Sequence, residues 1–483
     1  MMRSLYSGVA GLKTHQTRMD VIGNNIANVN TTAYKSQSMT FSDLMYQTTQ
    51  AASGANPTTG VGGVNARQIG LGSKTSAIKT AITGQGASQT TNDPFDIMIT
   101  GSNFFVVNNG QENFFTRDGS FYVDGAGNLC MTSTGYNVMG WLADEDPNSQ
   151  TYGTIKQDIV QRLQIMSPKY MTYPPEYTSK ATLSGIVDSY DTNIANPNGK
   201  LVTLDFYDNL GFKYTAMFSF HDDTTDTLAD GKFRLRLDKI KDPNGETLYG
   251  NANSSDDTLQ FANNEVAFKF STKDGTLEQV GDTAGNMVFA LNLSTVAAAA
   301  QPPSTTTPPD TAGTDKTSSQ GLPNFDGPIY IDCSTLTNLN NNGASTATCV
   351  RGDASNGAGA GRKLGEMSGV SIQKDGKIYA TYDNGQSRLL GQIATASFAN
   401  ASGLEKAGDN LYSSTQNSGD FDGIGVDITA GGGYMNTGVL EMSNVDLSAE
   451  FTEMITTQRG FQANSRIITV SDTLLEELTN LKR

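Results

Sequence analysis

The stretch SNVDLSAEFTEMITTQRGFQANSRIITVSDTLLEELTNL, residues 443–481, carries a strict apolar repeat near the end of the chain. Its large apolar residues recur every seven positions, at Leu447, Met454, Phe461, Ile468 and Leu475. Near the beginning of the chain the same spacing is found at Leu5, Leu12, Met19 and Ile26. A seven-residue apolar repeat is typical of a left-handed coiled coil, because one helix must cover the apolar seam of another. The two ends of the chain are therefore predicted to pair as helices.

The second apolar position of each repeat is less regular. Val9 supports the first seam and Phe451 supports the second, each four residues after a seam residue. Elsewhere this position is polar, at Gln16, Gln458, Ser465 and Asp472. The expected helices of about 25 and 35 residues would be ~37 and ~52 Å long. The longer helix would keep turns that need a further partner, which favours a stalk built for assembly over a self-contained one.

An antiparallel pair would bring the start of the first helix beside the end of the second. Arg3 would then lie near Glu476 and Glu477. Asp446 is the natural cap of the second helix, where a side-chain oxygen can accept from the first backbone N–H groups. Surface ion pairs of this kind contribute about 0–1 kcal/mol, so they would help to select the register more than the stability.

Between the helices the composition favours strands and turns. Gly is abundant, charged residues make up 17% of the 483 residues, and the net charge is −16. That charge argues against nucleic acid or an anionic membrane as the main partner. No long apolar run and no cleavable signal peptide is visible, so no membrane span is expected. Period-two alternation at Phe95, Ile97 and Ile99, with Asn-Gly and Asp-Gly turns after it, predicts short antiparallel strands.

The predicted fold is mainly β with α, with nested β domains carried on a stalk of paired N- and C-terminal helices. Each layer is expected to use one segment from either side of the next layer. The expected division is 1–31 and 445–483 for the coiled-coil stalk, 32–70 and 436–444 for a connecting segment, 71–145 and 362–435 for an inner β domain, and 146–361 for an outer inserted β region. A Pro/Thr-rich linker at 297–321 would divide the outer region into two domains.

The sequence offers little that suggests catalysis. Only two histidines occur, and His221, followed by Asp222 and Asp223, reads more readily as a solvated turn than as a site. We find no metal-ligand spacing, no nucleophile elbow and no phosphate-binding glycine loop. We therefore expect no enzyme activity and no cofactor. Arg351-Gly352-Asp353 allows an adhesion motif, although a three-residue match easily arises by chance.

Three cysteines are too few for a disulfide framework. Cys333 and Cys349 are close enough in sequence to close a small loop, and two unpaired thiols are the alternative. Cys130 occupies an otherwise aliphatic strand position and reads as a small buried hydrophobe, with a reactive thiol as the alternative.

Several motifs resemble those of the bacterial flagellar rod and hook protein family. GNNIANVNTTAYK (residues 23–35) closely resembles its N-terminal signature, and residues 443–481 resemble its C-terminal segment. GSNFFVV (101–107) and FTRDGSFYVDGAGNLCMTSTGYNVMGW (115–141) are similar to its inner β domain. One departure is Ala33, where the family pattern has Gly before the aromatic residue. The signature residues that the resemblance carries over are Gly23, Asn24, Asn25, Ala27, Asn28, Asn30, Thr31, Tyr34 and Lys35.

The resemblance implies a structural subunit. The long insertion between Trp141 and Arg362, with YDNLGFKYT resembling an outer-domain strand motif, favours a hook subunit over a distal rod subunit. Such subunits would be exported by the flagellar type III apparatus and polymerise into a curved tube outside the cell, on top of the basal body. The implied partners are further copies of the chain, the distal rod protein, the hook cap and the hook–filament junction proteins. A distal rod subunit and an extracellular adhesin-like protein remain the alternatives.

Overall fold

The structure is a computed structural model that describes residues 2–481 except 55–59, 61, 147–148, 223–230, 250–264, 282, 292, 294–324 and 326. It contains two compact units, each built from chain segments that are far apart in sequence. The first unit comprises Met1–Met171, Ser368–Thr381 and Ser387–Arg483, and the second comprises Thr172–Met367 and Tyr382–Gln386. The expected linker at 297–321 lies outside the described residues.

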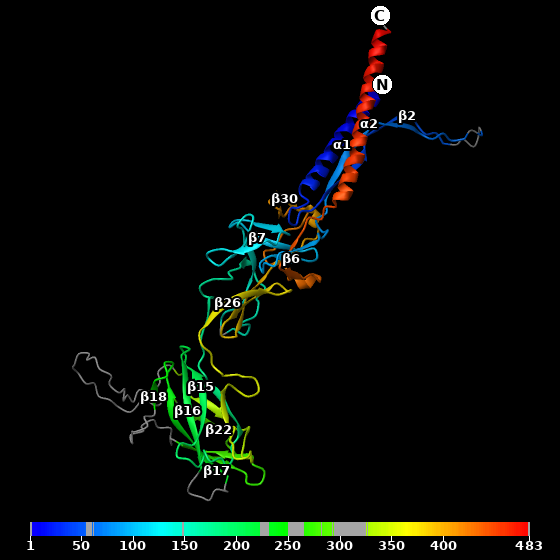
Figure 1. The fold of residues 1–483 in the computed structure, drawn as a ribbon. Helices are drawn as coiled ribbons and strands as arrows, with labels where there is room; N and C mark the ends of the chain where they lie inside the picture. Colours follow the sequence, from blue (N-terminus) through cyan, green and yellow to red (C-terminus); the bar gives the residue numbers. More distant parts are fainter. Residues whose placement is uncertain are drawn as a thin grey trace, which may run out of the picture. The chain divides into compact units, whose positions relative to one another are not determined.

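Two helices form the stalk of the first unit, α1 (Met2–Ala27) and α2 (Leu447–Asn480). They lie side by side and antiparallel, as Figure 1 shows in blue and red. Asp446 caps α2, because its carboxylate accepts hydrogen bonds from the backbone N–H groups of Ser448 and Ala449. The predicted pairing of the two chain ends is confirmed.

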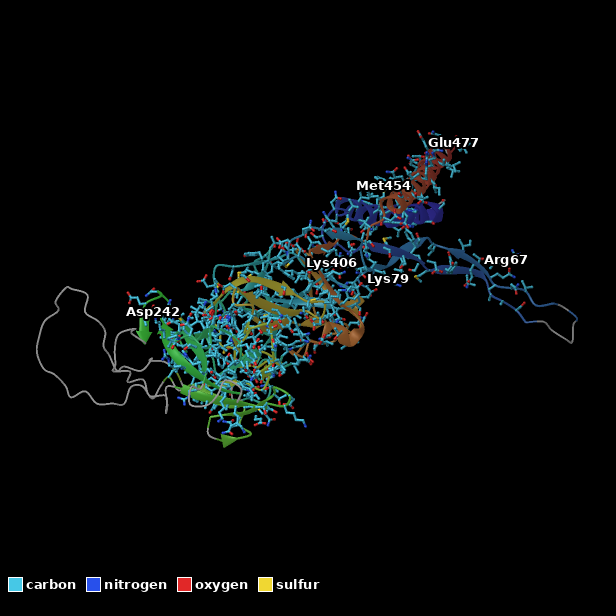
Figure 2. All side chains as sticks on the ribbon, turned by 60° about the horizontal axis from the view of Figure 1, so that its bottom comes forward. Arg67, Lys79, Asp242, Lys406, Met454 and Glu477 are labelled. Atoms are coloured by element: carbon cyan, nitrogen blue, oxygen red, sulfur yellow. The ribbon has the colours of Figure 1, made fainter. Side chains whose placement is uncertain are left out.

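Two β hairpins follow α1 in the chain. β1 (Gln37–Asp43) pairs with β4 (Ser73–Thr80) along the stalk, and Gly72 at the start of this return approaches Ser7 and Ala10 of α1 closely. β2 (Tyr46–Gln50) pairs with β3 (Arg67–Gly70) and both strands are exposed along their whole length. Figures 1 and 2 show this second hairpin, which carries Arg67, extending away from the helices.

The rest of the first unit is a set of short strands and two 3₁₀ turns, drawn from both halves of the chain. The strands are β5 (Ser88–Thr90), β6 (Ile97–Ile99), β7 (Phe104–Asn108), β8 (Asn113–Thr116), β9 (Phe121–Val123), β10 (Leu129–Met131), β11 (Asn137–Leu142), β12 (Gln161–Arg162), β27 (Lys377–Tyr382), β28 (Ser387–Ile393), β29 (Thr395–Ala396), β30 (Glu405–Gly408), β31 (Leu411–Ser413), β32 (Met435–Thr437) and β33 (Val439–Glu441). The 3₁₀ turns are η2 (Ala401–Gly403) and η3 (Ile428–Gly431), and β26 (Gly365–Ile372) continues the chain from the second unit into the first.

The strand order of the first unit explains its nesting. Its main sheet runs β27-β28-β11-β7-β8-β31-β30, so strands from residues 104–142 lie between strands from residues 377–413. Two smaller pairs, β6 with β32 and β5 with β33, also join the two halves. The core beneath the sheet is aromatic, with the rings of Phe115 and Phe398 4.7 Å apart edge to face.

The second unit contains two sheets around one core. One sheet has the order β15-β16-β17-β19-β20-β21 with β18 at the side of β17, and the other has the order β22-β23-β14-β24 with β25 beside β14. The strands are β13 (Thr172–Tyr173), β14 (Lys180–Ile186), β15 (Lys200–Tyr207), β16 (Lys213–Asp222), β17 (Lys232–Lys241), β18 (Thr247–Tyr249), β19 (Glu265–Phe270), β20 (Leu277–Val280), β21 (Thr283–Ala284), β22 (Val288–Leu291), β23 (Ile329–Asp332), β24 (Leu336–Thr337) and β25 (Thr348–Arg351).

Strict alternation in β15 produces the core of the second unit. Val202, Leu204 and Phe206 are buried, and Leu201 at the start of the strand is 47% exposed. Such alternation is what a sheet with one covered face requires. The same core includes Ala181 and other side chains of the sheet that contains β14, so the two sheets share one interior. The mainly β fold with terminal helices therefore agrees with the prediction from sequence.

Candidate assembly stalk and its junction with the body

The pairing of α1 and α2 depends on residues that let the helices approach closely. A Cβ atom added at Gly8 would lie 3.4 Å from Ile468 Cγ1, and one at Gly11 would lie 2.6 Å from Asn464 Nδ2. On the opposite helix, a Cβ at Gly460 would lie 2.8 Å from the ring of His15. These contacts run in opposite directions along the two helices, which shows the antiparallel register directly. Any larger side chain at Gly460 must push the helices apart or displace the His15 ring.

Polar contacts continue this register toward the start of α2. Arg18 forms an ion pair with Glu453, with Nη2 and Oε2 2.9 Å apart, and Asn25 Nδ2 donates to Glu450 Oε1 at 2.8 Å. Exposed pairs such as Arg18–Glu453 contribute little to stability. The expected ion pairs of Arg3 involve a side chain outside the described ones.

The structure corrects the second position of the predicted heptad. The side chains that face the partner helix lie three residues after the first apolar position, not four. On α2 this position holds Glu450, Thr457, Asn464 and Ser471, of which Thr457 and Ser471 are buried. Phe451 is 51% exposed and Val9 is 48% exposed, so both lie outside the contact between the helices. The apolar repeat does not indicate this contact position, because it is filled by small and polar residues.

The predicted first-position residues are partly covered. Half-buried side chains are found at Leu5, Leu12, Met19, Ile26, Met454, Phe461, Ile468 and Leu475. Leu447 is 38% exposed at the first turn of α2. Figure 2 labels Met454 within the paired part of α2 and Glu477 near its other end. One partner helix therefore covers only part of each apolar side chain.

Apolar side chains on the flanks of α2 are left uncovered in the single chain. The exposed ones are Phe451, Ile455, Ile467, Val470, Leu474, Leu478 and Leu481. The contacts of Gly8 with Ile468 and of Gly11 with Asn464 place the start of α1 beside about residue 474 of α2, so Leu478 on α2 and Leu481 just after it lie beyond the paired part. They form two groups, one at Phe451 and Ile455 and one from Ile467 to Leu481, and exposed apolar groups of this kind mark interaction surfaces.

The signature residues form the end of α1 and the turn that follows it. Asn25 is fully buried, and its Oδ1 accepts from the backbone N–H of Gln37 at 2.9 Å while its Nδ2 donates to Gln37 O at 2.8 Å. Asn24 Nδ2 donates to the Tyr34 hydroxyl, and Thr31 Oγ1 donates to Asn28 Oδ1. These side chains replace the backbone bonds that a continuing helix would have made. Gly23, Ala27 and Asn30 have exposed positions around this turn.

Ala33 adopts a backbone conformation that L-residues rarely use. Its φ is +53°, it is 2% exposed, and its N–H donates to Glu441 O at 2.8 Å. A side chain in the left-handed region costs about 1–2 kcal/mol, and glycine avoids that cost. The preference of the family pattern for Gly at this position therefore has a physical cause in the turn geometry.

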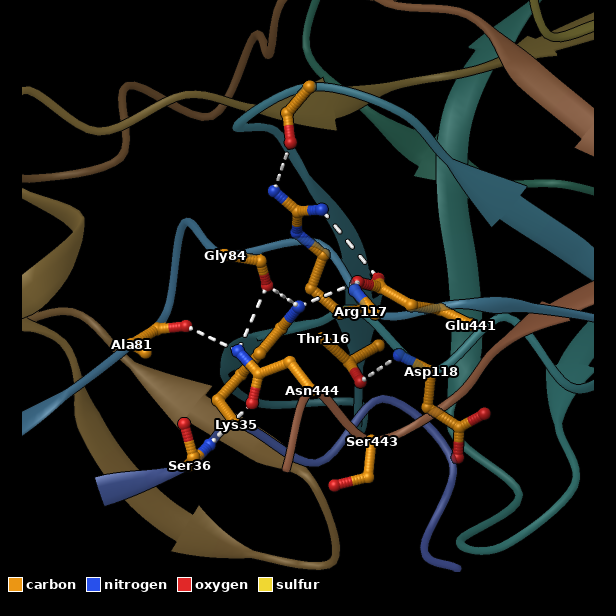
Figure 3. A network of polar contacts seen from close by, with 12 residues as sticks. Lys35, Ser36, Ala81, Gly84, Thr116, Arg117, Asp118, Glu441, Ser443 and Asn444 are labelled. Atoms are coloured by element: carbon orange, nitrogen blue, oxygen red, sulfur yellow. Dashed lines mark hydrogen bonds and ion pairs between the residues drawn. The ribbon is translucent and has the colours of Figure 1, made fainter. Parts of the chain in front are cut away.

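A buried charge cluster joins the N-terminal connection, the inner sheet and the C-terminal connection. Figure 3 shows Lys35, Arg117 and Glu441 meeting at this junction. Lys35 Nζ lies 2.6 Å from Glu441 Oε1, Arg117 Nη1 lies 3.7 Å from Glu441 Oε2, and all three side chains are fully buried. Burial lowers the pKa of Lys35, and the nearby Glu441 carboxylate partly offsets this effect. The cluster contains two cations and one anion.

Uncharged groups complete the cluster. Lys35 Nζ also donates to Gly84 O at 2.7 Å, and Glu441 Oε1 accepts from the Gly86 N–H at 2.8 Å. Arg117 Nη2 donates to Gly101 O, and its guanidinium lies 5.2 Å from the centre of the Phe104 ring. A Cβ at Gly86 would overlap the carbonyl of Met442, so only glycine fits there.

Asn444 makes a second connection beside the cluster, visible in Figure 3. Its Oδ1 accepts from the Ser36 N–H at 2.7 Å, and its Nδ2 donates to Ala81 O at 3.0 Å. Lys35 belongs to the family signature, but no sequence pattern connects it with Arg117, Glu441 or Asn444. The available signal was weak: a charged residue within or beside each of three separate family-like motifs.

The two candidate disulfide cysteines lie on opposite sides of one strand. Cys349 on β25 is opposite Leu183 of β14, and Cys333 directly follows Asp332, which pairs with Thr182 of β14 from the other side. Two strand spacings separate them by roughly 9.6 Å, beyond the ~7 Å limit for a bridge. The structure accordingly has both as free thiols, the second of the two alternatives, with burial raising the pKa of Cys349 to about 12.

The remaining candidate sites are engaged in the fold. The Arg351 guanidinium lies over the Tyr207 ring at 4.6 Å, and Asp353 accepts from Ser355 and pairs with Lys180. These contacts give the adhesion motif no support. Cys130 is buried, and burial raises its pKa. Asp223 of the His221 cluster lies outside the described residues.

Within the described part of the chain, no group of three His, Cys, Asp or Glu side chains could hold a metal ion. Over the same residues, no helix has the length and apolarity needed to cross a membrane.

Comparison with known proteins adds to this geometry. Three family models match in chain order: "Flagella basal body rod protein" at residues 5–35, "Flagellar hook protein FlgE/F/G D1 domain" at 98–179, and "Flagellar basal body rod FlgEFG protein C-terminal" at 436–481. The flagellar hook protein FlgE of Treponema pallidum is 37% identical over 487 aligned residues, which cover 100% of both chains. The chain belongs to the flagellar hook protein family.

Other members of this family and its rod relatives also match over the full length. The hook protein FlgE of Borreliella burgdorferi is 33% identical, and the basal-body rod protein FlgG of Bacillus subtilis is 27% identical, each covering 100% of both chains. The crystal structure of Helicobacter pylori flagellar hook protein FlgE2 covers 73% of this chain and 100% of that chain at 14% identity and a TM-score of 0.40. The matched family models place Lys35, Glu441 and both helices in family segments, and they indicate no catalytic family.

Proposed function

We propose that this chain is the structural subunit of the flagellar hook. It polymerises helically into a short curved tube on the cell exterior, on top of the basal body, and passes torque from the rod to the filament. The full-length relatives named as hook proteins support this function. A repeated contact between unlike surfaces that does not close into a ring produces such a helical tube.

One structural observation carries the proposal. The flanks of α2 expose apolar side chains that α1 does not cover, and Leu478 and Leu481 are 49% and 82% exposed. Because α1 packs against another face of α2, these flanks are available to helices of neighbouring copies. The stalk then acts as the assembly element, and the β domains form the body of the subunit.

The proposal includes further partners that belong to the same assembly. The subunit would leave the cell through the flagellar type III export apparatus. The tube would contact the distal rod protein at its base, and the hook cap and the hook–filament junction proteins at its tip. A net charge of −16 gives no basis for a nucleic-acid partner. The function needs no enzyme activity and no cofactor.

A distal rod subunit is the second candidate, because the Bacillus subtilis rod protein FlgG also aligns along the whole chain. The hook function is favoured since the relatives that are 37% and 33% identical are both named as hook proteins, and the rod protein is 27% identical. The two functions differ in the mechanical form of the polymer, which can be observed.

Electron microscopy of flagella from cells that express this chain as their only hook-type subunit tests the proposal. We expect short curved tubes that contain the chain. Straight stiff tubes would instead assign it to the rod, and swimming cells whose hooks lack the chain would contradict both functions.

The variant Gly460→Leu links the polymer to the stalk. We expect it to abolish the tubes, because its side chain must displace the His15 ring from between the helices. Gly125→Leu is the matched control, since a side chain there meets open space in an exposed turn and should leave the tubes intact. Normal tubes with Gly460→Leu would show that the closely packed stalk is not required for assembly.

A further inference from the structure

The single anion of the buried junction comes from the last tenth of the chain. Glu441 lies there, whereas the two cations that it contacts, Lys35 and Arg117, come from the first quarter. During synthesis or any delivery that begins at the N-terminus, both cations are present long before their counter-ion. The order of residues along the chain therefore imposes an order on closing the junction.

No other carboxylate takes the place of Glu441 among the residues that the structure describes. Apart from Glu441, Lys35 contacts the carbonyl of Gly84, and Arg117 contacts the carbonyl of Gly101 and the face of the Phe104 ring. Burying two cations without their anion is strongly unfavourable, because removing one partner leaves the others desolvated and uncompensated. The closed junction is thus unstable until Glu441 arrives.

The backbone around Glu441 connects the same segments. Glu441 O accepts from the N–H of Ala33, and the Met442 N–H donates to Ala87 O, both at 2.8 Å. β33, which ends at Glu441, also pairs with β5, from Val439 opposite Thr90 to Glu441 opposite Ser88. One short segment, residues 439–444, therefore holds both the exit from α1 and the strand that follows β4.

We propose that Glu441 is a completion latch. Its carboxylate makes ordering of the N-terminal connection (residues 33–36) and of residues 81–90 conditional on the presence of the C-terminal part of the chain. An incomplete chain keeps Lys35 and Arg117 in water, so α1 is not fixed to the inner sheet and the stalk is not presented in its assembly register. The latch extends the hook-subunit function proposed above, but it concerns folding within one chain.

Native-state hydrogen exchange on the full-length protein tests the latch. The backbone N–H groups of Ala33, Ala81 and Met442 report on the junction, because they donate to Glu441 O, Ser36 O and Ala87 O. With Glu441→Gln we expect all three to exchange at least about 100-fold faster, as loss of one partner from a buried ionic cluster predicts. The N–H groups within β7 and β8 should keep the exchange rates of the wild type.

Two further variants make the result specific to charge. Lys35→Met leaves a neutral pair of Arg117 and Glu441, so its acceleration should be at least tenfold smaller than that of Glu441→Gln. Glu405→Gln, on the exposed strand β30, should leave the exchange rates unchanged.

Acceleration confined to Met442 would overturn the latch, and so would equal effects of Lys35→Met and Glu441→Gln. Loss of protection in β7 and β8 would also overturn it, because Glu441 would then support the whole inner unit. None of these readouts requires polymerisation, so the latch and the hook function can fail separately.

Discussion

At the scale of single residues, a few positions reveal constraints that apolar patterns cannot show. Ala33 departs from the family pattern, which has Gly there, and its φ of +53° explains why glycine is favoured at this position. For Arg117 and Glu441 the sequence offers only their places within or beside family-like motifs, and that signal does not show that charges from distant segments share one buried site. Burial of a charge follows from tertiary packing, so the junction could be found only from the structure.

Replacing Ala33 with glycine should stabilise the protein. Removing the strain of the left-handed conformation stabilises the folded protein by about 1–2 kcal/mol. The greater conformational freedom of glycine stabilises the unfolded chain by about 0.4–1 kcal/mol, which offsets part of this gain. We expect Ala33→Gly to raise the free energy of unfolding of the first unit by about 0.5–1 kcal/mol net, measured by urea denaturation at pH 7. Ala77→Gly on β4, where φ is ordinary, should shift it in the opposite direction. A decrease with Ala33→Gly would show that the turn carries no strain.

At the scale of elements, the seven-residue period predicted both helices and their pairing, but it misplaced the second contact position. The coiled-coil rule searches for apolar residues, and here the facing positions are glycine, threonine, asparagine and serine. Glycines at Gly8, Gly11 and Gly460 bring the helices close, so polar side chains there are buried by backbone proximity instead of by apolar packing. Short strands with Asn-Gly turns were predictable for the opposite reason, since their signals are local.

The seam between the helices should weaken in mild acid because of His15. Burial, together with the nearby Arg18, lowers the pKa of His15 from 6.5, and its Nδ1 has no hydrogen-bond partner within the described structure. When the pKa of a base is lower in the folded protein than in the unfolded chain, the full stability is present above the pKa of the unfolded chain. That stability is lost as the pH falls through the pKa of the folded protein. The midpoint temperature of thermal unfolding of the stalk should therefore decrease when the pH is lowered from 7 to 5. Circular dichroism of the helices measures this change.

The variant His15→Gln separates this effect from other titrations. Burial raises the pKa of Glu450 at the start of α2, so its protonation favours the folded state in acid and acts in the opposite direction. The difference between wild type and His15→Gln isolates the histidine. Equal midpoint shifts in the two proteins over this pH range would exclude His15 as the cause.

At the scale of the whole molecule, nesting was predictable because similar strand patterns occur on both sides of a long insertion. The boundary between the units was less accessible: the outer region was predicted to begin at residue 146, whereas the first unit extends to Met171. The parallel pairing of β14 with β23 could not be read from sequence either. It joins strands that are far apart in the chain, and the local alternation of the strands between them does not indicate which distant strands pair.

The second unit should lose stability independently of the first. Leu204 on β15 is fully buried in a core formed only by residues of the second unit. Leu204→Ala should lower the free energy of unfolding of that unit by about 2–5 kcal/mol through lost contacts and a cavity. Leu201→Ala on the same strand, at an exposed position, should cost less than about 0.5 kcal/mol. Hydrogen exchange resolved by peptide would show the loss within residues 180–222, and an equal loss in β7 and β8 would contradict independence.

Strand β14 keeps Cys333 and Cys349 apart as unpaired thiols, and the burial of the native cysteines has a practical consequence for single-molecule work. Cys130 and Cys333 are buried and Cys349 is half-buried, and burial raises the pKa of each thiol, so at neutral pH the thiolate that reacts with maleimides is scarce. One cysteine introduced on an exposed turn would therefore take up a fluorophore selectively while the native cysteines stay in place. Rotation of a single labelled subunit could then be followed in a working flagellum without altering the interior of either unit.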